Sequence, residues 1–211
     1  TKEFQQIKRI VNVRLESATL NHPLIDKITN LTAEISKQLP RSSANDLCEL
    51  KDKIDALSKL SEKLDFLNQT EAVLGIKSPS IGVGYASAMV RISPYHKHYP
   101  FKGKVTSKIN ILAAQHEYEN FQLYLVPLID GIKGVDIKFN NLTHTNGKDI
   151  FSASNFKWFL EGYVTTKSSF TVAKYRLGRK PDPLLPGEKF DLDKEELAWI
   201  TVYVPQGQVP G

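Results

Sequence analysis

Glycine is missing from the first 74 residues of this 211-residue chain, and the whole chain contains one cysteine, Cys48. A single cysteine excludes an intramolecular disulfide framework and every Cys-x-x-Cys metal or redox motif. No apolar run approaches the roughly 18 residues of a membrane-spanning helix, so the sequence predicts no transmembrane segment. Hydrophobic residues make up 41% of the chain and charged residues 24%, which is typical of a globular protein.

The net charge of +5 is unevenly distributed along the chain. Residues 1–75 carry equal numbers of basic and acidic side chains, so the excess falls in residues 76–211 and is densest in His96–Lys104 and Lys174–Lys180. Basic stretches that contain aromatic residues can bind nucleic acid. No RNP-like, helix-turn-helix or zinc-finger pattern accompanies them, so we do not expect a nucleic-acid partner.

Three stretches of residues 1–75 have apolar residues three and four positions apart, which places them on one helix face. The spacing predicts helices over about 3–19, 22–39 and 43–69. Asn21 is expected to cap the second helix, with Pro23 in its first turn and Pro40 at its end. Ser61 interrupts the apolar stripe of the third helix. The three helices could form a local bundle, or the third could pair in a dimeric coiled coil.

From Gly75 onwards the chain becomes rich in glycine, serine and proline, and then short apolar runs alternate with turn residues. The candidate strands are Val83–Ile92, Val105–Ala113, Phe121–Val126, Val135–Phe139, Trp158–Thr165, Phe170–Tyr175 and Leu197–Val204. No helical period separates them, which argues against a parallel α/β sheet. The predicted fold class is therefore α+β, mainly β: a three-helix segment (1–75) followed by an antiparallel β-sandwich (76–211).

Three motifs in the second part carry a family resemblance: 'AAQHEYENFQLYLVP' (Ala113–Pro127), 'KPDPLLPG' (Lys180–Gly187) and 'LAWITVYVPQGQVPG' (Leu197–Gly211). In this order they resemble the N-terminal β-sandwich domain of glycoside hydrolase family 123 and its bacterial relatives. The resemblance covers about residues 83–211, and the helical segment has no part in it.

The motifs are also consistent with a scaffold. Both faces of the strand in 'EYENFQLYLVP' are largely apolar, with Phe121, Leu123 and Leu125 on one and Gln122, Tyr124 and Val126 on the other, which is typical of a strand covered on both sides. Glu117 and Glu119 are expected to bond loop amides or to face solvent rather than to act as an acid/base pair. Three prolines in 'PDPLLPG' predict a rigid extended crossing and not a strand, because each fixes φ and removes a donor. Leu184 and Leu185 would then fill the sandwich edge, and Asp182 would act as a turn acceptor.

The family resemblance implies a function only indirectly. Enzymes of this kind look like retaining β-N-acetylgalactosaminidases in which the substrate's own acetamido group acts as nucleophile. Their Asp–Glu pair lies in a (β/α)₈ barrel after the sandwich, so the resemblance assigns no catalytic residue and no cofactor to this chain. It implies a C-terminally truncated sandwich that serves as an accessory domain of a glycan-degrading enzyme. The expected partner is that barrel, and the expected location is secreted or periplasmic.

Two other functions stay open. A free-standing carbohydrate-binding module could use Trp158, Trp199 and Tyr175 to stack on a glycan, although tryptophans within strands are more usually buried in a core. Alternatively, the chain could be an interaction protein that pairs through its N-terminal helices.

Metal binding is not expected. His96 and His98 lack a third ligand nearby in the sequence. Asp191, Asp193 and Glu195 alternate, but they lack the pattern of a calcium loop.

Overall fold

The structure, a computed structural model, describes residues 2–18, 21–41, 46–90, 92, 104–166 and 178–210. Its α-helices are α1 (Lys2–Glu16), α2 (Pro23–Gln38) and α3 (Leu47–Leu74), with 3₁₀ turns η1 (Leu39–Arg41) and η3 (Ala153–Asn155). The strands are β1 (Ile81–Ser87), β2 (Glu117–Pro127), β3 (Ile132–Val135), β4 (Leu142–Thr143), β5 (Ile150–Phe151), β6 (Phe156–Thr166), β7 (Gly178–Pro186), β8 (Phe190–Leu192) and β9 (Glu196–Val204).

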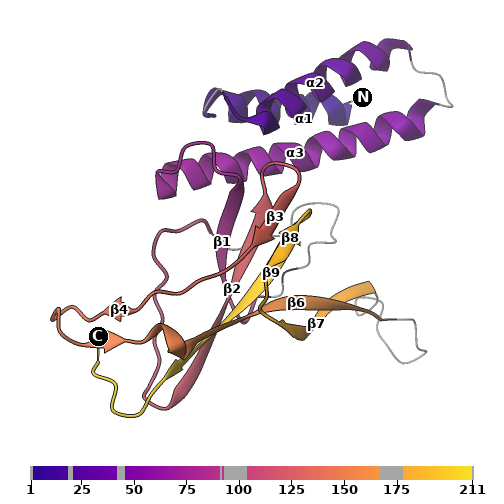
Figure 1. The fold of residues 1–211 in the computed structure, drawn as a ribbon. Coiled ribbons are helices and arrows are strands. Elements are labelled where there is room, and N and C mark those ends of the chain that lie inside the picture. Colours follow the sequence, from indigo (N-terminus) through magenta and orange to yellow (C-terminus); the bar gives the residue numbers. More distant parts are fainter. Residues whose placement is uncertain are drawn as a thin grey trace.

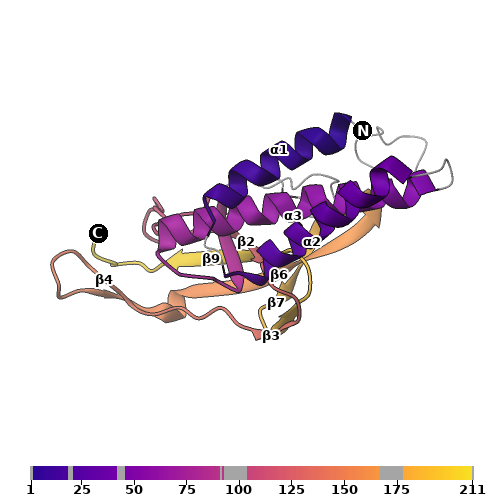
Figure 2. The same ribbon diagram turned by 90° about the horizontal axis from the view of Figure 1, so that it is seen from above.

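The three predicted helices are confirmed, and α3 lies between the other two and the sheet (Figures 1 and 2). Gly75, the first glycine of the chain, ends α3 in the left-handed conformation with φ 67°, which a residue without Cβ adopts easily. Within the described residues, no helix combines the length and apolarity needed to cross a membrane.

The cap of α2 differs from the prediction, because His22 and not Asn21 occupies the N-cap position. The backbone N–H of Leu24 donates to Nδ1 of His22 at 3.1 Å, so Nε2 carries the proton and donates to the carbonyl of Pro79 at 3.2 Å. The buried imidazole thus caps the helix and ties it to the segment that enters β1. Pro23 occupies the first turn, as expected.

Ser61, the polar residue that interrupts the apolar stripe of α3, forms a hydrogen bond with a charged side chain of α1. Nη1 of Arg14 donates to the Ser61 hydroxyl at 2.8 Å, and the side-chain amide of Asn68 donates to the Arg14 carbonyl at 2.9 Å. The rest of the stripe (Leu50, Ile54, Leu57, Leu64 and Leu67) is buried in one hydrophobic cluster with residues of α1 and α2. The face that a coiled-coil partner would use is therefore covered by the chain itself.

The main sheet has the strand order β1-β2-β9-β6-β7, and every pairing is antiparallel. One of its faces packs on α3. The Phe66 ring meets Tyr124 edge-on at 6.4 Å and lies over Gly82, where a Cβ would be 2.4 Å from the ring. Lys63 donates to the carbonyl of Pro127 at 3.0 Å and pairs with Glu195 at 3.2 Å. The helices and the sheet consequently share one core.

The opposite face of the sheet is covered by connecting segments and two small ladders, β3–β8 and β4–β5. Its buried residues are Phe121, Leu125, Leu192, Ala198, Ile200 and Val202. Both faces of β2 and β9 are thus apolar and covered, as the motif around Phe121 predicts. The α+β class, with three helices followed by antiparallel sheets, is confirmed.

The strand predictions need three corrections. The predicted strand Val135–Phe139 is not formed, because β3 ends at Val135 and residues 136–139 are irregular. Lys180–Gly187, expected to be a non-strand crossing, falls almost entirely in strand β7 (Gly178–Pro186), which lies at the sheet edge, where proline's missing N–H is tolerated. Leu184 and Leu185 are 44% and 47% exposed and do not fill a core. Residues 105–113 form no strand; only Lys104 bridges to Tyr85, and Leu112 is 94% exposed. The predicted strand Phe170–Tyr175 lies outside the described residues.

Candidate functional site

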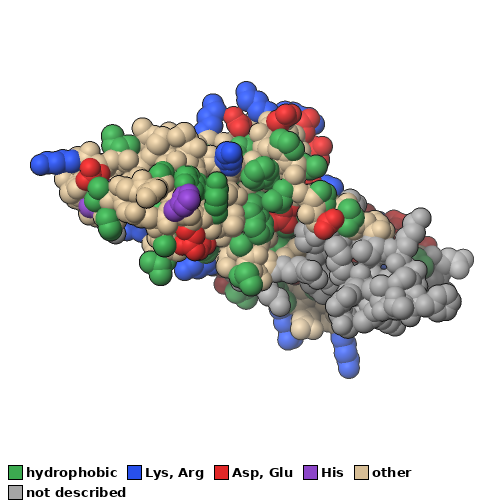
Figure 3. Space-filling view, turned by 90° about the horizontal axis from the view of Figure 1, so that it is seen from below, with side chains coloured by type: hydrophobic (Ala, Val, Ile, Leu, Met, Phe, Trp, Pro, Cys, Tyr) green, Lys and Arg blue, Asp and Glu red, His purple; other side chains and the backbone are tan. Residues whose placement is uncertain are grey.

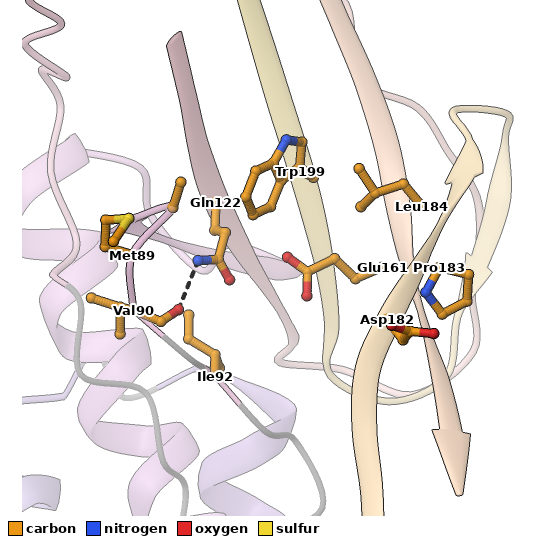
Figure 4. A pocket seen from close by; sticks show the side chains of 10 residues that line it. Met89, Val90, Ile92, Gln122, Glu161, Asp182, Pro183, Leu184 and Trp199 are labelled. Atoms are coloured by element: carbon orange, nitrogen blue, oxygen red, sulfur yellow. Dashed lines mark hydrogen bonds between the residues drawn. The ribbon is translucent and has the colours of Figure 1, made fainter. Parts of the chain in front are cut away.

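A cavity of about 410 Å³ opens on the sheet face that also carries Tyr124 and packs on α3. It lies between the segment that follows β1 and strands β2, β9, β6 and β7 (Figure 4). Its lining comprises Ala88, Met89, Val90, Ile92, Gln122, Glu161, Asp182, Pro183, Leu184 and Trp199. Five elements that are distant in the sequence therefore meet at this one site.

Glu161 is the most unusual residue of this cavity. It lies in β6 opposite Leu184 of β7 and is 6% exposed. Its Oε1 is buried and finds no hydrogen-bond partner in the described part of the chain. Burial raises the pKa of the Glu161 carboxyl to about 7, because removing the group from water penalises the charged form. A buried carboxyl without a partner is costly to stability and often marks a functional site.

The position of Glu161 depends on a local irregularity of the β6–β7 ladder. The register shifts between Glu161 and Tyr163, and Pro183 lies over Gly162, where a Cβ would be 2.7 Å from its ring. Glycine is needed at this point because any side chain would push β7 away. The close approach brings Asp182, which is exposed to solvent, to the rim of the same cavity as Glu161.

Gln122 forms the floor of the cavity and is 3% exposed. Its amide nitrogen donates to the carbonyls of Ser87 at 2.9 Å and Val90 at 2.8 Å, which fixes the segment after β1 against β2. The Val90 bond is drawn in Figure 4, where the amide oxygen points toward the side of Glu161. Both N–H groups are thus used, and the oxygen is the polar atom that Gln122 presents to the cavity.

Trp199 stands opposite Gln122 in the β2–β9 ladder and forms an aromatic wall. Its indole N–H donates to Oδ1 of Asn120 at 3.1 Å, and the same oxygen accepts a bond from the Thr201 hydroxyl at 2.8 Å. These bonds fix the ring orientation and occupy its only donor. The ring lies beside the Gln122 amide and the Glu161 carboxyl (Figure 4).

Two of the three predicted sugar-contact residues, Trp158 and Trp199, lie on opposite faces of the sheet. The strand register sets this arrangement, because Trp158 pairs with Ile200 and Trp199 pairs with Phe159. Trp158 packs near Phe190, with ring centroids 6.1 Å apart, and against Gly187. Both are half-buried. Tyr175 lies outside the described residues. A role of these residues in sugar binding stays a prediction.

Glu161 was not among the functional residues predicted from the sequence. The available signal was a single carboxylate within an otherwise aromatic and aliphatic strand, 'FKWFLEGYV', on the same strand face as Phe159. Of the paired acidic residues Glu117 and Glu119, Glu117 has an ordinary structural partner. Oε2 of Glu117 accepts the Ala114 amide at 2.6 Å, as the loop-amide interpretation predicts.

No group of three or more His, Cys, Asp or Glu side chains among the described residues could hold a metal ion. Lysines pair with the alternating carboxylates instead: Lys133 lies 3.1 Å from Asp191 and 3.6 Å from Asp193, and Lys63 bonds Glu195. The hydrogen bond from Lys133 lowers the pKa of Asp191 below its usual range. His96 and His98 lie outside the described residues.

A second, larger cavity of about 670 Å³ lies near the C-terminus, where Val209 and Pro210 contribute to its lining. Apolar residues of its lining include Leu112, Leu142 and Val209, which are 94%, 54% and 43% exposed. Seen from the side opposite the helices, hydrophobic side chains recur across the surface and lysines and arginines project mainly from its margins (Figure 3).

The comparisons with known proteins show the fold. No family model matches the chain, and no curated protein matches it. Among solved structures, the chain is similar to a family 123 glycoside hydrolase from Clostridium perfringens, studied for its hydrolysis of glycolipid glycans. The TM-score is 0.51 and the identity 17%; the match covers 63% of this chain and 23% of that enzyme. About two-thirds of this chain thus shares its fold with less than a quarter of the enzyme's length.

Proposed function

We propose that residues 76–211 form a non-catalytic supporting domain of a glycan-degrading enzyme. The observation that carries the proposal is the fold shared with 23% of a family 123 glycoside hydrolase, found independently of the three sequence motifs. The catalytic domain is the expected partner, and glycan hydrolysis belongs to that domain. The helical segment packs on one face of the sheet and stabilises it through the common core.

The apolar cavity near Leu112 supports this proposal as the surface that contacts the catalytic domain. Leu112, Leu142 and Val209 expose apolar area that a second domain would remove from water. Interfaces between domains of one chain typically have such a partly apolar centre.

The test uses the complete polypeptide that carries this chain. A Leu112→Asp/Leu142→Asp double variant should lower the thermal stability of the catalytic domain or its kcat/KM, because two charges would lie in the interface. Val13→Asp, which alters a similarly exposed apolar residue on α1, should change neither quantity. Equal behaviour of the double variant and the Val13 control would contradict this contact surface.

A further inference from the structure

Among the described residues, the polar side-chain atoms that face the cavity around Glu161 are acceptors when its carboxyl is ionised. Glu161 contributes an unpartnered carboxyl oxygen, Asp182 a carboxylate, and Gln122 its amide oxygen, since both N–H groups of that amide are bound to backbone carbonyls. The indole N–H of Trp199 is also used, by Asn120. When Glu161 is ionised, the polar side-chain atoms that face the cavity among the described lining residues therefore all need N–H or O–H donors from a ligand.

The walls of the cavity point to an organic ligand rather than a bare metal ion. The acceptors lie among aromatic and aliphatic side chains, those of Trp199, Val90, Met89 and Leu184. Of these, Met89 is 92% exposed. The volume of about 410 Å³ far exceeds what an ion needs. An aromatic ring beside carboxylates is also the environment that attracts an organic cation through its quadrupole.

We propose that this cavity binds a small organic cation, whose ammonium or guanidinium N–H groups donate to Glu161 Oε1 and whose carbon skeleton packs on Trp199. The Gln122 oxygen and the Asp182 carboxylate at the rim supply the remaining acceptors. The cation provides a positive charge beside the buried Glu161 carboxylate. Its charge-assisted hydrogen bond gives Glu161 Oε1 a donor.

Binding of such a cation should be linked to proton release from Glu161. The carboxyl has a pKa of about 7 in the empty cavity, so it is about one-tenth ionised at pH 6 and nine-tenths ionised at pH 8. A cation binds the ionised form, and its affinity should consequently rise roughly tenfold between these pH values. Asp182 is the other titratable side chain among the described lining residues, and it is exposed.

The experiment titrates the whole chain with benzylamine, which is cationic at both pH values, and with benzyl alcohol, its neutral counterpart of similar size. The indole N–H resonance of Trp199, assigned with Trp199→Phe, reports binding by NMR. At pH 8 benzylamine should bind at least tenfold more tightly than benzyl alcohol, and this preference should largely disappear at pH 6.

Glu161→Gln keeps the shape of the side chain and removes its charge, so it should abolish both the preference for benzylamine and its pH dependence. Glu188→Gln alters an exposed carboxylate that does not line the cavity and should leave both unchanged. Equal affinities for the amine and the alcohol, unaltered amine binding in a folded Glu161→Gln variant, or no binding by either probe would overturn the proposal. None of these results bears on the supporting-domain proposal, which rests on the fold.

Discussion

Glu161→Gln is expected to stabilise the protein at pH 8 and to have little effect at acidic pH. Folding moves the Glu161 carboxyl from water into the cavity and raises its pKa from an ordinary 4.5 to about 7. Between these values the unfolded chain has released a proton that the native protein still holds, so stability falls as pH rises. Below pH 4.5 both states are protonated and the penalty is absent.

The size of this effect follows from the pKa difference. Each pKa unit corresponds to 1.36 kcal/mol, so the ionised carboxyl costs about 3 kcal/mol at pH 8 and about 1 kcal/mol at pH 5. Glutamine has nearly the same shape and carries no charge, and the substitution should remove this penalty. The gain in unfolding free energy should therefore be about 2 kcal/mol larger at pH 8 than at pH 5.

Urea unfolding of both proteins at the two pH values, followed by far-UV circular dichroism, measures this difference directly. Comparing the variant with the wild type at each pH cancels the titration of all other groups. Asp182→Asn serves as the control, since that exposed carboxylate should give no comparable pH-dependent gain. A gain that is the same at both pH values, or a variant less stable at pH 8, would refute the reasoning.

Three further substitutions test the common core. Gly82→Ala should cost about 1–3 kcal/mol because the new Cβ overlaps the Phe66 ring, and thermal unfolding measures the loss. Leu57→Ala should cost about 2–5 kcal/mol, since Leu57 is fully buried on α3; a loss below 1 kcal/mol in urea unfolding would contradict that burial. His22→Ala should cost about 1–3 kcal/mol and make amide hydrogen exchange faster in the first turn of α2, because it removes the cap and the bond to Pro79; unchanged exchange there would argue against the cap.

The helices were predictable because their signals are local. The three-and-four spacing of apolar residues and Pro23 at the start of α2 depend on neighbours within one or two turns. The end of the third helix was predicted near residue 69, whereas α3 continues to Leu74 and Gly75 caps it. The partner of Ser61 was not predictable in this way, since Arg14 lies 47 positions away. The motif around Phe121 likewise announced a strand covered on both faces, but not which elements cover it.

The β7 strand and the cavity depend on contacts that the sequence does not show. Prolines in 'PDPLLPG' exclude a central strand, and only the position at the sheet edge makes the strand possible. The buried environment of Glu161 depends on long-range contacts: Pro183 of β7 packs over Gly162, and Trp199 lines the same cavity as Glu161. The sequence suggested that Trp158 and Trp199 could stack on one glycan, whereas the strand register places them on opposite faces of the sheet.

The central claim, that this chain supports hydrolysis carried out elsewhere in the protein, is tested most directly by one activity measurement. The purified chain and the complete polypeptide are compared on an aryl β-N-acetylgalactosaminide at equal molar concentration. The account predicts turnover by the complete polypeptide and none above the blank by the chain alone. Turnover by the chain alone that Glu161→Gln abolishes would contradict it, because the catalytic group would then lie in the cavity described above.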